Sequence, residues 1–248
     1  MTDWPEGYGR RVLDEVDSTN AEAARIAAGL AGPEWILALR QTAARGRRGR
    51  PWVNPEGNFA ATLVMPMSEP PDHAALRSFV AALALYDALE AVIGTRAGLS
   101  LKWPNDVLLN GGKLAGILLE SAGGPRGWLA IGVGVNLLAA PDAAQVEPGA
   151  VPPVSLLVET GVRVTPERFL DALAASFARH ETTLATYGFD PLRRLWLDRA
   201  ARLGEGVTAR TLRDSVSGVF ETVDASGQLV LKTPKGRVSI AAADIFFE

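Results

Sequence analysis

The 248-residue sequence lacks cysteine altogether and has only two histidines, which narrows the chemistry that it can perform. Without cysteine there can be no disulfide, no thiolate nucleophile and no cysteine-ligated metal site. His73 and His180 are too few for a histidine-rich metal site. The GxSxG motif, which forms the nucleophile elbow of many hydrolases, is also missing. We therefore expect neither covalent nor histidine-based catalysis.

Long apolar runs, a leader segment and a strong net charge are absent as well. The longest uncharged apolar-rich run, residues 127–141, is too short to cross a bilayer, and the N-terminus has no signal-peptide pattern. The formal net charge is −3, whereas general affinity for nucleic acids needs a broad basic face. Hydrophobic residues make up 48% of the chain, which is too many for a disordered protein. These features predict a globular protein of the cytoplasm.

One segment, ARGRRGRPW at 44–52, is nevertheless densely basic. Its arginines fall within six positions: Arg45, Arg47, Arg48 and Arg50. They could form an ordinary solvated loop, but guanidinium groups match phosphate oxygens, and the two intervening glycines let the backbone approach a ligand closely. Because the patch is local, it favours a small polyanion such as a nucleoside triphosphate over a duplex. An RNA contact, with Trp52 stacked on a base, remains open at this point.

A second informative segment is KWPNDVLLNGGKLAGILLE, residues 102–120. Pro104 cannot donate a hydrogen bond to a strand ladder, so Asn105 and Asp106 should lie at a strand boundary with free side chains. Lys113 should begin a later strand, where it could neutralise charge in a transition state. Taken singly, Asp106 could be a turn former and Lys113 a guard against edge-strand aggregation. Their clustering favours nucleotidyl or phosphoryl transfer promoted by positive charge.

Two shorter patterns give weaker signals. IGVGVN, residues 131–136, has two glycines within a strand pattern, which is typical of a ligand that approaches the backbone. It is not a dinucleotide-binding fingerprint, because no GxGxxG opens a helix. The STN segment at 18–20 should lie at a helix N-terminus, where Thr19 and Glu22 fit a capping box. Such a terminus could equally bind a polar head group.

Periodicity and turn residues predict an α/β (α+β) fold: a mixed, mostly antiparallel sheet backed by helices, with a small C-terminal SH3-like β-barrel. Helices are expected at 18–30, 74–93, 165–187 and 191–200. Strands are expected at 10–16, 35–42, 59–65, 99–103, 106–109, 113–120 and 128–136, with hairpin turns at 110–112 and 123–127. After Gly204 short strands alternate with turns, so we expect a catalytic domain at 1–203 and a barrel domain at 204–248.

Together, these motifs resemble those of the biotin protein ligases (biotin–acetyl-CoA-carboxylase ligases). The segments that carry the resemblance, in order, are DSTN (17–20), QTAARGRRGRPW (41–52), KWPNDVLLNGGKLAGILLE (102–120) and IGVGVN (131–136). The β-rich region after about residue 205 resembles the family's C-terminal domain. The resemblance implies a two-step reaction, in which biotin and MgATP give biotinyl-5′-AMP and pyrophosphate. The biotinyl group then passes to one lysine of a biotin carboxyl carrier protein domain.

The resemblance also implies roles for individual residues. Those expected to bind biotin are Ser18, Thr19, Asn20, Gln41, Arg45, Gly46, Arg47, Lys113, Gly116, Gly132 and Gly134. Those expected to bind ATP and the adenylate are Arg45, Arg47, Arg48, Arg50, Trp52, Asn105, Asp106 and Asn136. Lys113 and Arg47 are the expected catalytic residues, and Asp106 is a candidate ligand for Mg²⁺. The segment 45–52 is expected to close over the ligand and shield the mixed anhydride from water.

The sequence departs from the family pattern at Ala44, where the loop usually begins with glycine. If this position required a positive φ, alanine would cost about 1 kcal/mol or reshape the loop. Some members carry an N-terminal helix-turn-helix domain, for which there is no room before residue 17, so we expect no DNA-binding role. Two alternatives stay open: a lipoate or octanoate ligase of the same fold, and a non-catalytic RNA-binding module. An exposed strand edge would allow a homodimer.

Overall fold

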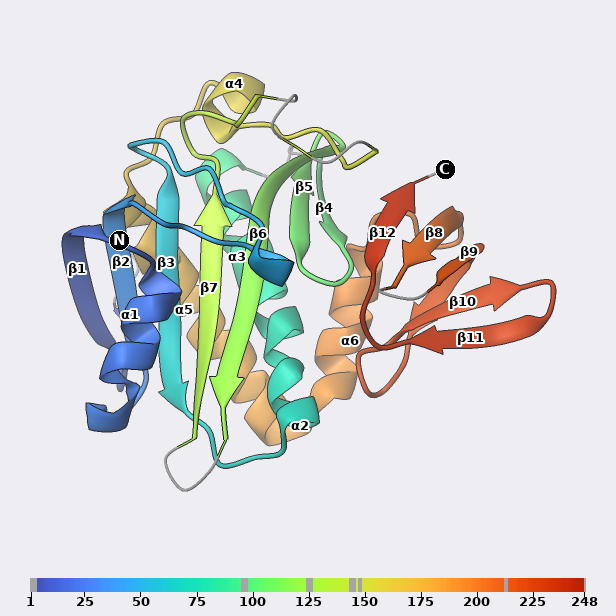
Figure 1. Ribbon diagram of the computed structural model, residues 1–248, viewed down its shortest axis with the longest axis horizontal. Coiled ribbons are helices and arrows are strands. Elements are labelled where there is room, and N and C mark those ends of the chain that lie inside the picture. The colour runs from blue at the N-terminus through green and yellow to red at the C-terminus, as the bar shows by residue number, and fades with distance from the viewer. Residues whose placement is uncertain are drawn as a thin grey trace.

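The computed structural model describes residues 4–94, 98–123, 127–142, 146, 149–211 and 214–247. Its larger part is a seven-stranded sheet with the order β1-β2-β3-β7-β6-β5-β4 (Figure 1). Only the β1–β2 pair is parallel, which confirms the predicted mixed, mostly antiparallel sheet. The strands are β1 (Gly9–Val16), β2 (Glu34–Gln41), β3 (Phe59–Pro66), β4 (Leu99–Lys102), β5 (Asp106–Leu109), β6 (Gly112–Ala122) and β7 (Trp128–Val135).

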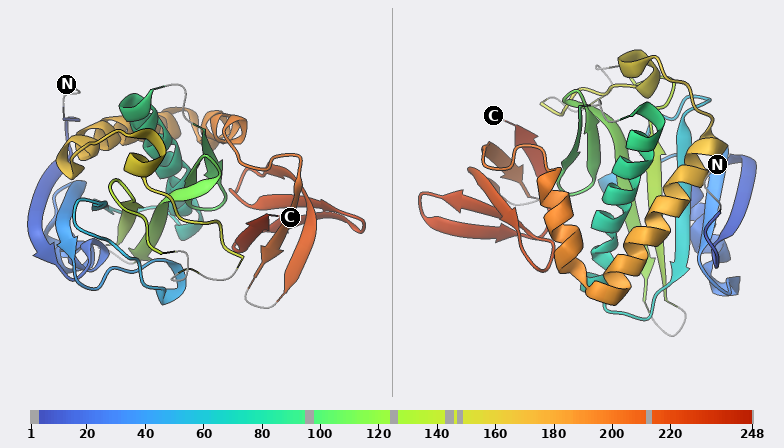
Figure 2. Two further views of the ribbon diagram at one scale, coloured as in Figure 1. Left: turned by 90° about the horizontal axis from the view of Figure 1, so that it is seen from above. Right: turned by 180° about the vertical axis from the view of Figure 1, so that it is seen from behind.

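Helices lie on both faces of this sheet (Figures 1 and 2). A parallel strand pair needs a crossover connection, and α1 (Thr19–Ile26) provides it on one face. On the other face lie α3 (Arg77–Ile93) and α5 (Pro166–Tyr187), whose apolar sides form the core with the sheet. The remaining helical segments are α2 (Pro71–Ala75), α4 (Leu156–Thr160), α6 (Phe189–Asp198) and the 3₁₀ turns η1 (Ala27–Gly29) and η2 (Arg47–Gly49).

The end of the chain forms a separate five-stranded antiparallel sheet, in which β12 returns to pair with β8. Its strands are β8 (Gly206–Arg210), β9 (Ser215–Val223), β10 (Leu229–Thr233), β11 (Gly236–Ile240) and β12 (Asp244–Phe247). Trp196 of α6 packs between Phe79 and Phe220, with ring centroids 5.4 and 6.5 Å away. One hydrophobic core therefore joins both sheets, and this fixes the position of β12 relative to the larger sheet.

One local expectation is wrong in a way that bears on the site. The helix after β1 begins at Thr19, so Ser18 is its N-cap, and no side chain makes a capping hydrogen bond. The predicted capping box of Thr19 and Glu22 does not form, because both residues lie inside the helix. Thr19 and Asn20 are instead buried against neighbouring strands, with exposed fractions of 4% each.

Other local expectations are confirmed or fall outside the described residues. The turn at Asn110 and Gly111 has φ values of 50° and 81°, as expected for a tight hairpin. The helix expected at 74–93 begins earlier and is divided into α2 and α3. Residues 124–126 of the second expected hairpin turn lie outside the described residues. None of the helices in the described ranges is long and apolar enough to span a membrane.

Candidate active site

A cavity of about 350 Å³ lies where the α1 face of the large sheet meets the basic loop and β12. It gathers residues that are far apart in the sequence. The predicted residues that line it are Ser18, Thr19, Asn20, Gln41, Arg45, Gly46, Arg47, Arg50, Trp52, Asn105, Asp106, Lys113, Gly116, Gly132, Gly134 and Asn136. Among the predicted site residues, all of them described, Arg48 alone is not part of the lining. The four sequence segments singled out above therefore line one cavity.

The sheet side of the cavity holds a chain of neutral polar groups. The Thr19 backbone N–H donates to Gln41 Oε1 over 2.8 Å. The Thr62 hydroxyl lies 2.8 Å from Thr19 Oγ1 and 2.7 Å from Asn20 Oδ1. Asn20 Nδ2 in turn donates to Glu120 Oε2 over 2.8 Å. Side chains of α1, β2, β3 and β6 thus fix one another, and the Thr19 hydroxyl, which the predicted capping box required, is bonded to Thr62 and Gln41 instead.

The glycines of β6 and β7 make room for side chains that cross the sheet face. A Cβ atom at Gly132 would lie 2.2 Å from Asn20 Oδ1, and one at Gly134 would lie 2.7 Å from the indole of Trp52. A Cβ at Gly116 would lie 3.3 Å from the same indole. A side chain at Gly132 or Gly134 would clash with Asn20 or Trp52 as they are placed here. Glycine at these two positions therefore serves close approach of side chains and not a positive φ.

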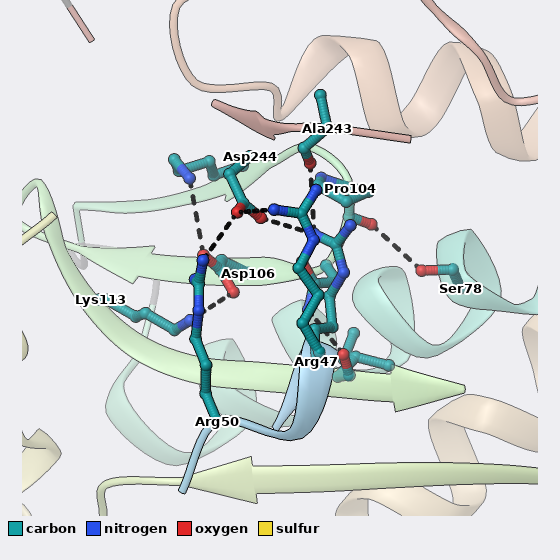
Figure 3. Close-up of polar contacts among 12 residues, drawn as sticks. Arg47, Arg50, Ser78, Pro104, Asp106, Lys113, Ala243 and Asp244 are labelled. Carbon is teal, nitrogen blue, oxygen red and sulfur yellow. Dashed lines mark hydrogen bonds and ion pairs between the residues drawn. The ribbon is translucent and has the colours of Figure 1, made fainter. Parts of the chain in front are cut away.

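A cluster of opposite charges forms the next part of the wall. Lys113 Nζ lies 2.7 Å from Asp106 Oδ1 (Figure 3). Lys102 Nζ lies 3.6 Å from Asp106 Oδ2. Burial would raise the pKa of Asp106, but the two ammonium groups outweigh it and hold that pKa below its ordinary value. Burial also lowers the pKa of Lys102, more than the charge of Asp106 raises it.

The backbone of Lys113 is held on both sides. On one side it pairs with Leu108 of β5, next to a register shift between Val107 and Leu108. On the other side its N–H donates to the Pro152 carbonyl over 2.8 Å, and its carbonyl accepts from the Val154 N–H over 3.0 Å. A β-bulge re-aims a side chain, and here it accompanies the residue whose ammonium group reaches the cavity.

The basic loop is a tight hairpin rather than an open loop. The Gly46 N–H donates to the Arg50 carbonyl over 2.7 Å, and the Trp52 N–H donates to the Ala44 carbonyl over 3.0 Å. At its tip Arg48 and Gly49 have positive φ values of 58° and 72°. Ala44 is not among the non-glycine residues with positive φ, so the strain considered for alanine at this position does not arise.

Carboxylates outside the loop hold its arginines. The carboxylate of Asp244, the first residue of β12, lies 3.4 Å from Arg47 and 3.0 Å from Arg50 (Figure 3). It also lies 2.9 Å from Arg48. Arg45 pairs with Glu120 at 3.2 Å. Arg47 also donates to Asn105 Oδ1 and the Ala243 carbonyl, both over 3.3 Å, and burial lowers its pKa. Carboxylate oxygens thus pair with the same guanidinium N–H groups that a bound phosphate would use.

Sequence reasoning missed four polar residues of the site or its support: Thr62, Lys102, Glu120 and Asp244. Lys102 had a usable signal, because it lies four residues before Asp106 in a segment already singled out. Thr62 stands in an apolar strand, where a lone polar residue is often a solvent-facing one. Glu120 ends the segment 102–120, but nothing in that segment connects it to Asn20, which lies 100 positions away. Asp244 is nearly 200 positions away from the arginines that it binds, so no local pattern could connect them.

Several known proteins are similar to this chain in sequence or in fold. Residues 12–136 match the model of the biotin/lipoate A/B protein ligase family, and residues 203–248 match that of the biotin protein ligase C terminal domain. A biotin--[acetyl-CoA-carboxylase] ligase of Paracoccus denitrificans is 58% identical over 95% of this chain and 99% of its own. The bifunctional ligase/repressor BirA of Bacillus subtilis is 31% identical over 94% of this chain and 73% of its own.

Among solved structures, the biotin protein ligase of Aquifex aeolicus in complex with biotin and ATP superimposes with a TM-score of 0.81. It is 24% identical and covers 96% of this chain and 97% of its own, a level that supports the shared fold.

Proposed function

Because this chain belongs to the biotin/lipoate A/B protein ligase family, we propose that its cavity is the active site of an ATP-dependent biotin ligase. The observation that carries the proposal is the convergence of all four family segments on one cavity. The reaction has two steps. A biotin carboxylate oxygen attacks the α-phosphorus of ATP, and pyrophosphate leaves. The amine of a lysine on a biotin carboxyl carrier domain then attacks the acyl carbon of biotinyl-5′-AMP, and AMP leaves.

Biotin would lie on the sheet side of the cavity. Its cyclic urea offers one carbonyl acceptor and two N–H donors, which suit the neutral groups of Ser18, Thr19, Asn20 and Gln41. Gly132, Gly134 and Gly116 keep the sheet face low enough for a flat bicyclic ligand. Gly46 and Arg45 would border the same region from the loop. Burial of these polar groups makes each misplaced hydrogen bond costly, which favours specificity.

The adenine would lie near Asn136, at the end of β7. Asn136 is 2% exposed, and its Nδ2 donates to the Val154 carbonyl over 3.0 Å. Its Oδ1 is buried without a hydrogen-bond partner. A buried acceptor of this kind is costly unless a ligand supplies a donor, and the exocyclic amine of adenine is one.

The reacting phosphate would lie between the loop and the Lys113–Asp106 cluster. Lys113 can contact the biotin carboxylate and the α-phosphate together and neutralise charge as the bond forms. Arg47 and Arg50 would hold the phosphates, with Arg48 supporting the tip of the loop and Asn105 orienting Arg47. Trp52, which lies over Gly134, would close the site and keep water from the mixed anhydride.

Mg²⁺ would enter with ATP rather than occupy a preformed protein site. The described residues contain no cluster of three or more His, Asp or Glu side chains able to hold a metal. Asp106 remains the candidate protein ligand, but its carboxylate is already paired with Lys113 and Lys102. In this arrangement Asp106 is therefore a poor ligand for Mg²⁺. Magnesium is commonly held mainly by phosphate oxygens and water, with few protein carboxylates.

Several broader features belong to the same proposal. Residues 1–203 would form the catalytic domain, and residues 204–248 a C-terminal domain that contributes Asp244 to the nucleotide side. The use of ATP favours a location in the cytoplasm. The outer edge of β1 is a strand edge through which two copies could pair; sedimentation that shows only a 26.3 kDa species across concentrations would remove that idea.

The proposal is tested by transfer to a carrier. The purified protein would be incubated with biotin, MgATP and a biotin carboxyl carrier domain, and the carrier analysed by intact-mass and peptide mass spectrometry. One biotinyl group on one lysine is expected, with no labelling of a carrier in which that lysine is arginine. An unmodified carrier would overturn the proposed transfer step.

A further inference from the structure

Glu120 connects the two sides of the cavity and was not among the expected site residues. It lies on β6 and is paired with Ala130 of β7, close to the sheet face that carries α1. Its carboxylate accepts from Asn20 Nδ2 over 2.8 Å and from Arg45 over 3.2 Å. We infer that Glu120 is a positioning residue that fixes which end of the Asn20 amide meets the head group of the ligand.

The argument begins with what a carboxylate can do. An ionised carboxylate only accepts hydrogen bonds, so the Asn20 amide must turn its NH₂ toward Glu120. The carbonyl end then faces Thr62, which lies 2.7 Å from Asn20 Oδ1. The opposite orientation would place two acceptors face to face at Glu120. Thr62 cannot make this choice alone, because a hydroxyl both donates and accepts.

The consequence passes along the chain of polar groups. Because Asn20 Oδ1 is an acceptor, the single hydroxyl hydrogen of Thr62 is committed to it. Thr62 Oγ1 can then only be an acceptor toward the Thr19 hydroxyl, 2.8 Å away, whose own hydrogen can go to Thr62 or to Gln41 Oε1 at 3.2 Å. The Thr19 backbone N–H fixes Gln41 through Oε1, which leaves the Gln41 NH₂ as a donor. Glu120 thus determines the orientation of the Asn20 amide and, through it, the direction of the Thr62 hydroxyl hydrogen, whereas the Thr19 backbone orients Gln41 independently.

The surroundings of Asn20 prevent its amide from finding other hydrogen-bond partners. The residue is 4% exposed, and its carboxamide lies so close to β7 that only glycine fits at position 132. A buried amide with a wrong partner loses a hydrogen bond that water cannot replace. The inference rests on the proposed function, in which Asn20 faces the cyclic urea of biotin. It predicts that Glu120 acts on biotin recognition and not on ATP.

The second contact of Glu120 is weaker evidence for a role. The Arg45–Glu120 pair is partly exposed, with side-chain accessibilities of 44% and 32%. Exposed ion pairs contribute little. We therefore expect the loss of this pair to have the smaller effect when Glu120 is changed, and the loss of amide orientation the larger one.

The test uses Glu120→Gln, which keeps size but can present either a donor or an acceptor to Asn20. Biotin-dependent pyrophosphate release would be measured at varied biotin and at varied ATP. We expect the biotin KM to rise about tenfold, with the ATP KM and kcat within about twofold of wild type. Thr62→Val should also raise the biotin KM, and Thr62→Ser, which keeps the hydroxyl, should restore it. The double variant should be less than additive, because both changes act on one amide.

Glu159→Gln provides the matched control. Asn110 Nδ2 donates to Glu159 Oε2 over 2.8 Å, the same pair of groups outside the cavity, so this variant should leave both KM values unchanged. If Glu120→Gln leaves the biotin KM unchanged while the wild-type enzyme turns over, the inference is wrong and the proposed function stands. If the folded wild-type protein releases no pyrophosphate with biotin, the proposed function fails and the inference with it.

Discussion

The sheet side and the loop side of the cavity hold their polar groups by different means. On the sheet side, Thr19, Asn20 and Thr62 are neutral, at most 4% exposed, and bonded to one another. On the loop side, the arginines are charged, and Arg50 has 48% of its side chain exposed. Their carboxylate partners are groups that a phosphate can replace. The contrast supports the proposed arrangement, in which a preformed site for a neutral head group lies beside a loop whose ion pairs can be exchanged for those of an anionic ligand.

The largest effect should come from Lys113→Ala, which removes the cation where the two sides meet. Adenylate formation should slow by about 100- to 1,000-fold, because a charge aimed at the reacting phosphate is lost. Quenched-flow measurement of biotinyl-5′-AMP would give the rate. Calorimetric titration should show that biotin binding weakens far less than adenylation slows, since Lys113 would contact the biotin carboxylate but not the head group held by the neutral chain. Adenylation within a fewfold of wild type would show that the role is assigned wrongly.

A matched pair of glycine substitutions would test the rigidity of the two sides. Gly132→Ala places a Cβ 2.2 Å from the buried Asn20 amide, whereas Gly134→Ala places one 2.7 Å from the loop residue Trp52. We expect Gly132→Ala to lower the free energy of unfolding by about 1–3 kcal/mol and to raise the biotin KM more than tenfold. Gly134→Ala should change the free energy of unfolding and the biotin KM less, because the loop that carries Trp52 can shift. If the two variants changed the melting temperature and the biotin KM equally, the proposed difference in rigidity between the sheet side and the loop side would be contradicted.

A smaller effect of opposite sign is expected from Asp244→Asn. Its carboxylate competes with phosphate for three arginines, so its loss should lower the ATP KM about threefold while the biotin KM stays constant. Glu221→Gln, which breaks the exposed Arg237 ion pair of the same C-terminal sheet, is the control and should change neither. A higher ATP KM in Asp244→Asn would mean that Asp244 positions the arginines rather than competing for them.

The smallest effect on activity should come from Asp87→Asn, behind the sheet. Burial would raise the pKa of Asp87, but the hydrogen bond from His180 at 2.7 Å and the charge of Arg199 at 2.8 Å outweigh it and lower that pKa. A lowered pKa contributes stability above the unfolded value of about 4, and the contribution is lost as pH falls through the folded value.

Asp87→Asn should therefore unfold more easily than wild type near pH 7, by about 1–3 kcal/mol, with kinetics unchanged at temperatures where it is folded. The difference should shrink below about pH 4. Urea denaturation at several pH values would measure it, and a difference independent of pH would refute the assignment.

The sequence was sufficient for most of the fold because its signals are local. Alternating apolar strands, the Asn110–Gly111 turn and the amphipathic helix ending at Tyr187 each appear where they were predicted. The cavity lining was also largely predictable, because the family segments stand out. The capping box predicted for Thr19 and Glu22 was wrong, because the Thr19 hydroxyl has tertiary partners. Glu120 and Asp244 were beyond reach, since only the folded chain brings them to Asn20 and to the arginines.

The most direct measurement is pyrophosphate release by the purified protein with MgATP, supplied separately with biotin, lipoate and octanoate. The neutral polar chain and the family relationship predict release with biotin, accompanied by biotinyl-5′-AMP bound to the protein in mass spectrometry. Release only with lipoate or octanoate would contradict the assignment of the sheet side to a cyclic urea. Release with none of the three acids would contradict adenylation itself, and salt-dependent RNA binding would then be measured.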